Sequence, residues 1–90
     1  MDSRILTFIE AAKTLSFSKT AKKRCMSQPN VSIQIRQLED EVGHRLFDRY
    51  SHHVQLTPYG QVFYSYAVKV KSLEDDMKRQ MKALSLRIDD

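Results

Sequence analysis

The sequence contains few of the residues that cross-link a chain or interrupt its helices and strands. Its 90 residues include one cysteine, two glycines, two prolines and no tryptophan. A single cysteine cannot form an internal disulfide, which argues against a disulfide-stabilised secreted domain and favours a reduced, cytoplasmic setting. Two glycines leave no room for the glycine-rich phosphate loop of many nucleotide-binding proteins.

Long apolar runs are also missing. The longest apolar stretches are only a few residues, whereas a membrane-spanning helix needs roughly 20. The first residues contain no apolar segment of the signal-peptide kind. We therefore expect no membrane partner.

Charge is abundant, and it is unequally divided. Lysine and arginine outnumber aspartate and glutamate by 15 to 11, a formal net charge of +4. This excess mildly favours a polyanionic partner such as nucleic acid. Neither a nucleophile–base motif nor a metal-ligand spacing is recognisable, so we predict no enzyme, no cofactor and no metal site.

Two short helices are predicted at the start of the chain. Asp2 or Ser3 can cap the first helix. Ser18 is expected to cap the second, which ends near Arg24, with Phe17 packed just before it. The apolar residues of the first helix recur at helical spacing: Ile5, Phe8, Ile9, Ala12 and Leu15.

A third helix follows a tight connection. Ser27 is a favourable N-cap, Pro29 is tolerated in the first turn, and Gly43 suits the C-terminal end. Cys25, in the connection, is expected to be a small buried hydrophobe, although basic neighbours make a redox role conceivable. One apolar stripe should face the core: Val31, Ile35, Leu38 and Val42.

The remaining chain predicts a hairpin and one long helix. Residues 46–56 hold β-favouring residues on both sides of a turn. Thr57 and Pro58 form an N-cap and first-residue pair, after which a helical pattern continues. The pattern still runs where the sequence stops, which indicates a piece of a longer chain. We therefore divide the chain into a winged helix-turn-helix at 1–57 and a long C-terminal helix at 58–90.

The last helix is predicted to dimerise. It spans about 30 residues and carries an apolar heptad pattern that the small preceding domain cannot bury, which favours a second copy of the chain. A solvated helix that meets only its own domain is the alternative. The expected dimer contacts are Tyr59, Phe63, Tyr66, Val70, Leu73, Met77, Met81 and Leu84.

The third helix is predicted to enter the major groove of DNA. In a helix-turn-helix the second helix reads base edges with its front residues, and Gln28, Asn30 and Ser32 carry suitable donors and acceptors. Lysines of the preceding helix, such as Lys19, would contribute salt-dependent affinity for phosphate. The acidic run 39–41 should keep the back half away from DNA. A merely solvated polar face remains the alternative.

The chain resembles the DNA-binding domain of LysR-type bacterial transcriptional regulators. The resemblance covers residues 1–60, is most specific from Ser27 to Arg49, and the following helix is similar to that family's linker helix. The matching residues are Ser16-Phe17-Ser18, Ala21, Ser27-Gln28-Pro29, Val31-Ser32, Gln34-Ile35-Arg36, Leu38-Glu39, Gly43, Leu46-Phe47, Arg49, Val54, Leu56-Thr57 and Gly60.

The resemblance implies a mainly α fold, a winged helix-turn-helix of three helices and a two-stranded wing, followed by a long C-terminal dimerisation helix. It also implies a homodimer on an imperfect inverted repeat of double-stranded DNA, and higher oligomers for a full-length protein. A small-molecule effector would bind only a C-terminal domain outside this sequence. Such a protein acts in the bacterial cytoplasm, on the nucleoid.

The predicted DNA-contacting residues lie on the two helices and the wing. The resemblance puts Gln28, Pro29, Ser32 and Ile33 at major-groove positions and Arg49, His52 and His53 in the wing. The full predicted set is Ser18, Lys19, Ser27, Gln28, Pro29, Asn30, Ser32, Ile33, Arg36, Arg49, His52 and His53.

The sequence departs from the family pattern at three places. Ile33 stands where arginine is usual, and its side chain could pack on a thymine methyl group, or merely contact deoxyribose. Arg24 stands where leucine is usual, and we expect its stem to lie on apolar surface with the guanidinium in water or near phosphate. His52, His53 and Gln55 make the wing less basic.

A different class of function is also open. The long helix could be the active part of a pure protein-interaction module, with the basic face incidental. Salt separates the two hypotheses, because specific DNA binding weakens steeply with salt and a heptad dimer does not.

Overall fold

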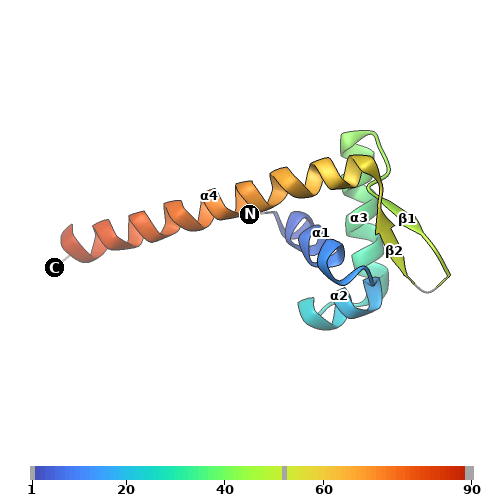
Figure 1. Ribbon diagram of the computed structural model, residues 1–90. Coiled ribbons are helices and arrows are strands. Elements are labelled where there is room, and N and C mark those ends of the chain that lie inside the picture. Colours follow the sequence, from blue (N-terminus) through green and yellow to red (C-terminus); the bar gives the residue numbers. More distant parts are fainter. Residues whose placement is uncertain (1, 52, 89–90) are drawn as a thin grey trace.

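The computed structural model describes residues 2–51 and 53–88. Three helices form a compact body, a two-stranded hairpin flanks it, and a long helix projects away from it (Figure 1). In chain order the elements are α1 (Ser3–Thr14), α2 (Phe17–Arg24), α3 (Gln28–Val42), β1 (Phe47–Arg49), β2 (Val54–Leu56) and α4 (Pro58–Ile88). The predicted fold class is therefore confirmed.

Each helix begins at a side chain that accepts a backbone hydrogen bond. Asp2 accepts from the amide of Arg4 at 2.8 Å, and Ser27 accepts from the amide of Asn30 at 3.2 Å. Thr57 Oγ1 accepts from the amide of Gly60 at 3.0 Å. These bonds satisfy amides that the first turn leaves unpaired.

The second helix begins earlier than predicted. Its N-cap is Ser16, whose side chain accepts from the amide of Lys19 at 3.1 Å. The assignment of the cap to Ser18 was therefore wrong. Phe17 is the first residue of the helix and is buried, because the earlier start turns its ring into the core.

Three helices end at a residue in the left-handed conformation. Gly43 has φ 77°, as predicted for this end, but Leu15 (φ 53°) and Cys25 (φ 55°) also adopt it. Both side chains are exposed, which corrects the prediction of a buried Cys25 and takes Leu15 off the core face. Reversing the chain at these two positions turns their side chains outward.

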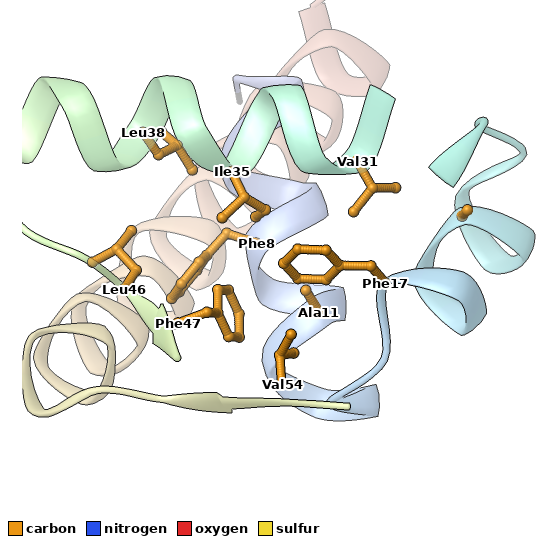
Figure 2. Close-up of a cluster of buried hydrophobic side chains, with 10 residues drawn as sticks. Phe8, Ala11, Phe17, Val31, Ile35, Leu38, Leu46, Phe47 and Val54 are labelled. Atoms are coloured by element: carbon orange, nitrogen blue, oxygen red, sulfur yellow. The ribbon is translucent and has the colours of Figure 1, made fainter. Parts of the chain in front are cut away.

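The core lies where α1, α2, α3 and the hairpin meet (Figure 2). Phe8 lies at its centre: its ring centroid is 5.3 Å from that of Phe47 and 4.8 Å from that of Phe63. Phe47 also meets Phe17 edge-on at 5.5 Å. The buried cluster comprises Phe8, Ala11, Phe17, Ala21, Val31, Ile35, Leu38, Leu46, Phe47 and Val54.

The stripe predicted on α3 is only partly buried. Val31, Ile35 and Leu38 belong to the core, but Val42 is 39% exposed. Its predicted core position was therefore wrong. Val42 lies in the last turn of α3, at the edge of the body, where it lines an apolar groove beside α4 instead.

The hairpin is held against both α1 and α4. Phe47 pairs with Leu56 and Arg49 with Val54 in antiparallel register. The amide of Val54 donates to the carbonyl oxygen of Leu15. On the far side, the amide of Thr57 donates to the carbonyl oxygen of Leu46, which aims α4 away from the body.

The long helix leaves its own domain after its first turns. Gly60 and Ala67 are its buried residues, and the later turns project beyond α1 (Figure 1). The molecule is consequently elongated, with extents of 56 × 26 × 19 Å. Within the described residues, every helix is too short or too polar to cross a lipid bilayer.

Candidate nucleic-acid interface

The front of α3 presents its side chains to solvent. Pro29, Ile33 and Arg36 follow each other at intervals of four and three residues, and all three are exposed. Ile33 has half of its surface exposed. The opposite side of α3 holds the buried Val31 and Ile35, so packing against the body turns this face outward as predicted.

A groove separates the front of α3 from the hairpin. Its volume is about 280 Å³, and its walls come from the start of α2, the first turns of α3 and the wing. Five of the predicted site residues line it together: Ser18, Gln28, Ser32, Arg49 and His53. The structure therefore brings residues from 18 to 53 of the sequence to one surface.

Other residues of the predicted set lie outside the groove. Lys19 and Asn30 are exposed on α2 and α3 but do not line it. Ser27 uses its side-chain oxygen to cap α3. His52 lies outside the described residues.

Besides the core residues Phe17 and Val54, three residues of this groove were missed by prediction from the sequence. Ser16, Tyr50 and Ser51 were not among the predicted DNA-contacting residues, and all three line the groove. The Tyr50 ring stacks on that of His53, with centroids 5.2 Å apart. The polar residues next to Arg49 were the only signal in the sequence for this part of the groove. Polarity alone does not show which surface of the molecule a turn faces.

Arginine side chains connect this groove to a second hollow. Arg49 lines both, and its guanidinium lies over the Phe17 ring, 5.2 Å from the centroid. Arg36 and Arg45 join it in the second hollow, a wide depression of about 710 Å³ beside the back half of α3. Three arginines therefore lie on the hairpin side of α3, in a hollow that Glu39 and Asp40 also line.

The acidic run at the back of α3 serves the fold. Glu39 Oε2 accepts hydrogen bonds from the amides of Leu46 at 2.8 Å and Phe47 at 3.3 Å. Glu41 Oε1 accepts from Arg4 at 2.6 Å. Two of the three carboxylates thus bond to groups within the domain. They stabilise the fold in addition to carrying the negative charge that was expected to repel DNA.

Arg24 is not extended toward solvent or phosphate. Its guanidinium donates to Thr7 and Ser3 of α1. The prediction of a guanidinium in water or near phosphate was therefore wrong, because polar groups on α1 stand within reach of the end of α2.

A continuous apolar stripe is exposed along α4. Successive members are three, four and four residues apart, close on average to the 3.6 residues of a helical turn, so the stripe runs nearly straight. Phe63 is not among them, since it packs on Phe8 and Val62 faces outward instead. The stripe consists of Tyr59, Val62, Tyr66, Val70, Leu73, Met77, Met81, Leu84 and Ile88, each at least half exposed.

The base of α4 carries an apolar groove continuous with this stripe. Its volume is about 300 Å³, and its walls include Val42 and Leu46 from the body and Val62 and Tyr66 from α4. The rings of His44 and Tyr59 stack at its edge with centroids 3.8 Å apart.

The groups needed for metal chemistry do not gather in the described part of the chain. Within residues 2–51 and 53–88, no three histidine, cysteine, aspartate or glutamate side chains are placed to hold a metal ion. The surface built by α3 and the hairpin offers amides, hydroxyls and guanidinium groups, which suit recognition of an extended polyanion.

A helix-turn-helix followed by a two-stranded wing, with an exposed polar front on the second helix of the motif, defines a winged-helix nucleic-acid-binding domain. Residues 3–61 match the profile of the bacterial regulatory helix-turn-helix proteins of the lysR family. The chain belongs to this family, and the predicted resemblance is confirmed.

Two characterised relatives illustrate the match. The transcriptional regulator BenM of Acinetobacter baylyi is 41% identical over 78 residues, which are 87% of this chain and 26% of BenM. The transcriptional regulator CitR of Bacillus subtilis is also 41% identical over 78 residues, with the same two shares. The chain thus spans about a quarter of the length of these relatives.

A solved structure shows the same fold. The crystal structure of the BenM DNA-binding domain with catB site 1 DNA superposes with a TM-score of 0.89 at 38% identity, covering 94% of this chain and 96% of that one.

Proposed function

We propose that this chain is the DNA-binding and dimerisation part of a transcriptional regulator that binds an imperfect inverted repeat in promoter DNA. The observation that carries the proposal is the groove in which Gln28 and Ser32 of α3 face Arg49 and His53 of the hairpin. Its role is binding rather than catalysis, on the nucleoid of the bacterial cytoplasm.

The groove fits the strand of DNA that separates two grooves of the duplex. A domain that places α3 in the major groove and its wing toward the adjacent minor groove straddles one sugar-phosphate strand. Ser32, Ser51 and Arg49 supply hydroxyl and guanidinium donors on the two sides of this space. Such donors fix the register of a protein on DNA through phosphate oxygens.

The exposed front of α3 is the part that reads sequence. Gln28 can pair with adenine through two hydrogen bonds, and Ile33 can pack on a thymine methyl group. Lys19 on α2 and Arg36 on α3 add charge whose effect on affinity depends on salt. Pro29, Asn30 and Ser18 complete the contacting surface, with Ser27 holding the turn in place.

The exposed stripe of α4 supports a homodimer. A helix of 31 residues with nine outward apolar side chains leaves a large surface for a partner, and isolated apolar patches of this length mark interaction sites. A full-length protein would add the effector-binding domain and the contacts for higher oligomers.

Charge favours an antiparallel pair of α4 helices. A parallel pair in register would set the acidic triad 74–76 against its own copy. Reversing the partner about Leu73 instead brings Lys71 opposite Asp75, and Val62 opposite Leu84, of the partner subunit. The groove at the base of α4 would then receive the far end of the partner's helix.

Selection from a pool of random duplexes tests this function. We expect enrichment of an inverted repeat whose half-site centres are about 34 Å apart, or a multiple of that distance. Affinity for the enriched duplex should fall steeply with salt. A pool that stays random, with dimerisation unaffected, would support the pure protein-interaction module instead.

A further inference from the structure

Three helices of the body meet through a chain of hydrogen bonds at Thr7. Arg24, the last residue of α2, donates from Nε to Thr7 Oγ1 at 3.3 Å. Thr7, in α1, donates from Oγ1 to Gln34 Oε1 of α3 at 2.6 Å. Nη2 of Arg24 also donates to the backbone oxygen and the hydroxyl of Ser3, at 3.3 and 3.1 Å.

The direction of this chain follows from the number of hydrogens available. Thr7 is fully buried, and its hydroxyl has one proton to donate. Because the guanidinium has no acceptor, it occupies a lone pair of Oγ1 and leaves that proton to be donated. Gln34 Oε1, at 2.6 Å, is a nearer and stronger acceptor for it than Met26 Sδ at 3.6 Å. A charged donor on Oγ1 also polarises the hydroxyl and strengthens the bond that the hydroxyl donates.

We propose that Arg24 is a positioning residue for DNA reading, which acts through Thr7 to fix Gln34 and so the rotation of α3 about its axis. The inference rests on the proposed DNA-binding function. Arg24 would then contribute to DNA recognition without touching DNA, because its guanidinium is bonded to α1.

The other directional contacts of α3 hold its back half, where Glu39 accepts from the Leu46 and Phe47 amides and Glu41 accepts from Arg4. The front half is packed against the body by apolar side chains, and the Gln34 bond is the directional contact beside it. Val31, Ile35 and Leu38 are apolar, and apolar burial has no preferred direction. A hydrogen bond is directional. Gln34 directly follows Ile33, so a small rotation at Gln34 displaces the residues that face the DNA.

Lys23 provides a matched control from the same turn of α2. It pairs with Glu10 of α1 at 3.2 Å and therefore also joins α2 to α1. Its side chain is 67% exposed, and the pair lacks a link to α3 in the described contacts. Lys23→Met thus removes a neighbouring cation and a tie between the same helices without touching the chain of bonds to Gln34.

The test compares Arg24→Met, Thr7→Val, the double variant and Lys23→Met on a selected duplex and a scrambled one, over a range of salt. We expect Arg24→Met and Thr7→Val each to lower the ratio of specific to non-specific affinity about tenfold, the size of one hydrogen bond to a charged group. The double variant should lose no more than either single one. Lys23→Met should leave the ratio unchanged.

The salt slope distinguishes positioning from direct contact. Loss of one phosphate contact lowers the slope of log affinity against log salt by about 0.9. We expect the slope of Arg24→Met to match that of the wild type. A slope reduced by that amount, losses that add in the double variant, or a lower melting temperature with an unchanged ratio would each overturn the proposal.

A measurement without DNA keeps the inference separate from the proposed function. The side-chain amide signals of Gln34 in an NMR spectrum should shift in Arg24→Met and in Thr7→Val, and not in Lys23→Met. Shifted signals in a protein that prefers no duplex would reject the function and leave the bond chain intact. Unshifted signals would reject the bond chain itself.

Discussion

Gly60 of α4 lies directly against the backbone carbonyl of Leu46. A Cβ at this position would overlap the Leu46 carbonyl oxygen and lie 2.8 Å from Cδ2 of Leu56. The glycine therefore lets the first turn of α4 pack on the loop before the wing, and it ties the direction of the long helix to the position of the hairpin.

Replacing this glycine should disturb the joint between the body and α4. We expect Gly60→Ala to lower the free energy of unfolding by about 2–4 kcal/mol, because the backbone cannot yield as a side chain would. Gly43→Ala is the control: its Cβ would meet no atom within 4 Å, and only its positive φ costs about 1 kcal/mol. Urea unfolding measures both, and equal losses would contradict the close contact.

The negative charge of Asp2, at the start of α1, should make the stability of the fold depend on pH in acid. The hydrogen bonds from the Arg4 side chain and amide to Asp2 hold the pKa of that carboxyl below its usual 3.8. A lowered pKa stabilises the fold above pH 3.8, and this contribution disappears as the pH falls through the folded-state pKa.

Asp2→Asn isolates the charge because asparagine also caps helices well. We expect the variant to be less stable than the wild type at pH 7, with the difference closing as the pH falls below about 4. Unfolding in urea at a series of pH values gives the comparison. A difference that stays constant with pH would show that the Asp2 charge contributes nothing.

Cross-linking tests the orientation of the dimer. In a Cys25→Ser background, Val62→Cys and Leu84→Cys are prepared as separate proteins and then mixed. The antiparallel pair predicts disulfide formation between the two variants in the mixture and little within either variant alone. Rapid cross-linking of Val62→Cys with itself would show a parallel pair.

Ile33 should read a thymine methyl group. Half of its surface is exposed on the front of α3, so its side chain is free to pack on a base. Substituting uracil for thymine at one half-site position should cost the wild type about 1 kcal/mol, the scale of burying one methyl-sized apolar group. Ile33→Ala should lose this preference. If uracil is tolerated at every position, Ile33 contacts only sugar or solvent.

The helix ends were predictable where a single local signal decides them. Ser27 and Gly43 flank α3 in an unambiguous sequence, and both predictions are confirmed. Ser16 and Ser18 lie on either side of Phe17, and either could cap α2. The packing of Phe17 on Phe47 decides between them, and that contact joins residues 30 positions apart.

The exposure of the α3 front could be predicted from the sequence, but the shape of the groove beside it could not. The polarity of the α3 front indicated the surface that we propose to read bases, whereas the groove needs the hairpin to stand opposite Gln28 and Ser32. Likewise, the role of Glu39 depends on the amides of Leu46 and Phe47. Neither the Glu39 contacts nor the ties of Arg24 to α1 follow from helical periodicity.

The most direct measurement of the central claim is the affinity of Gln28→Ala for a selected duplex and for a scrambled duplex, at several salt concentrations. If the front turn of α3 reads base edges, discrimination between the duplexes falls by about 1–3 kcal/mol while the salt slope stays that of the wild type. Unchanged discrimination would contradict the account and mean that this turn does not face the bases.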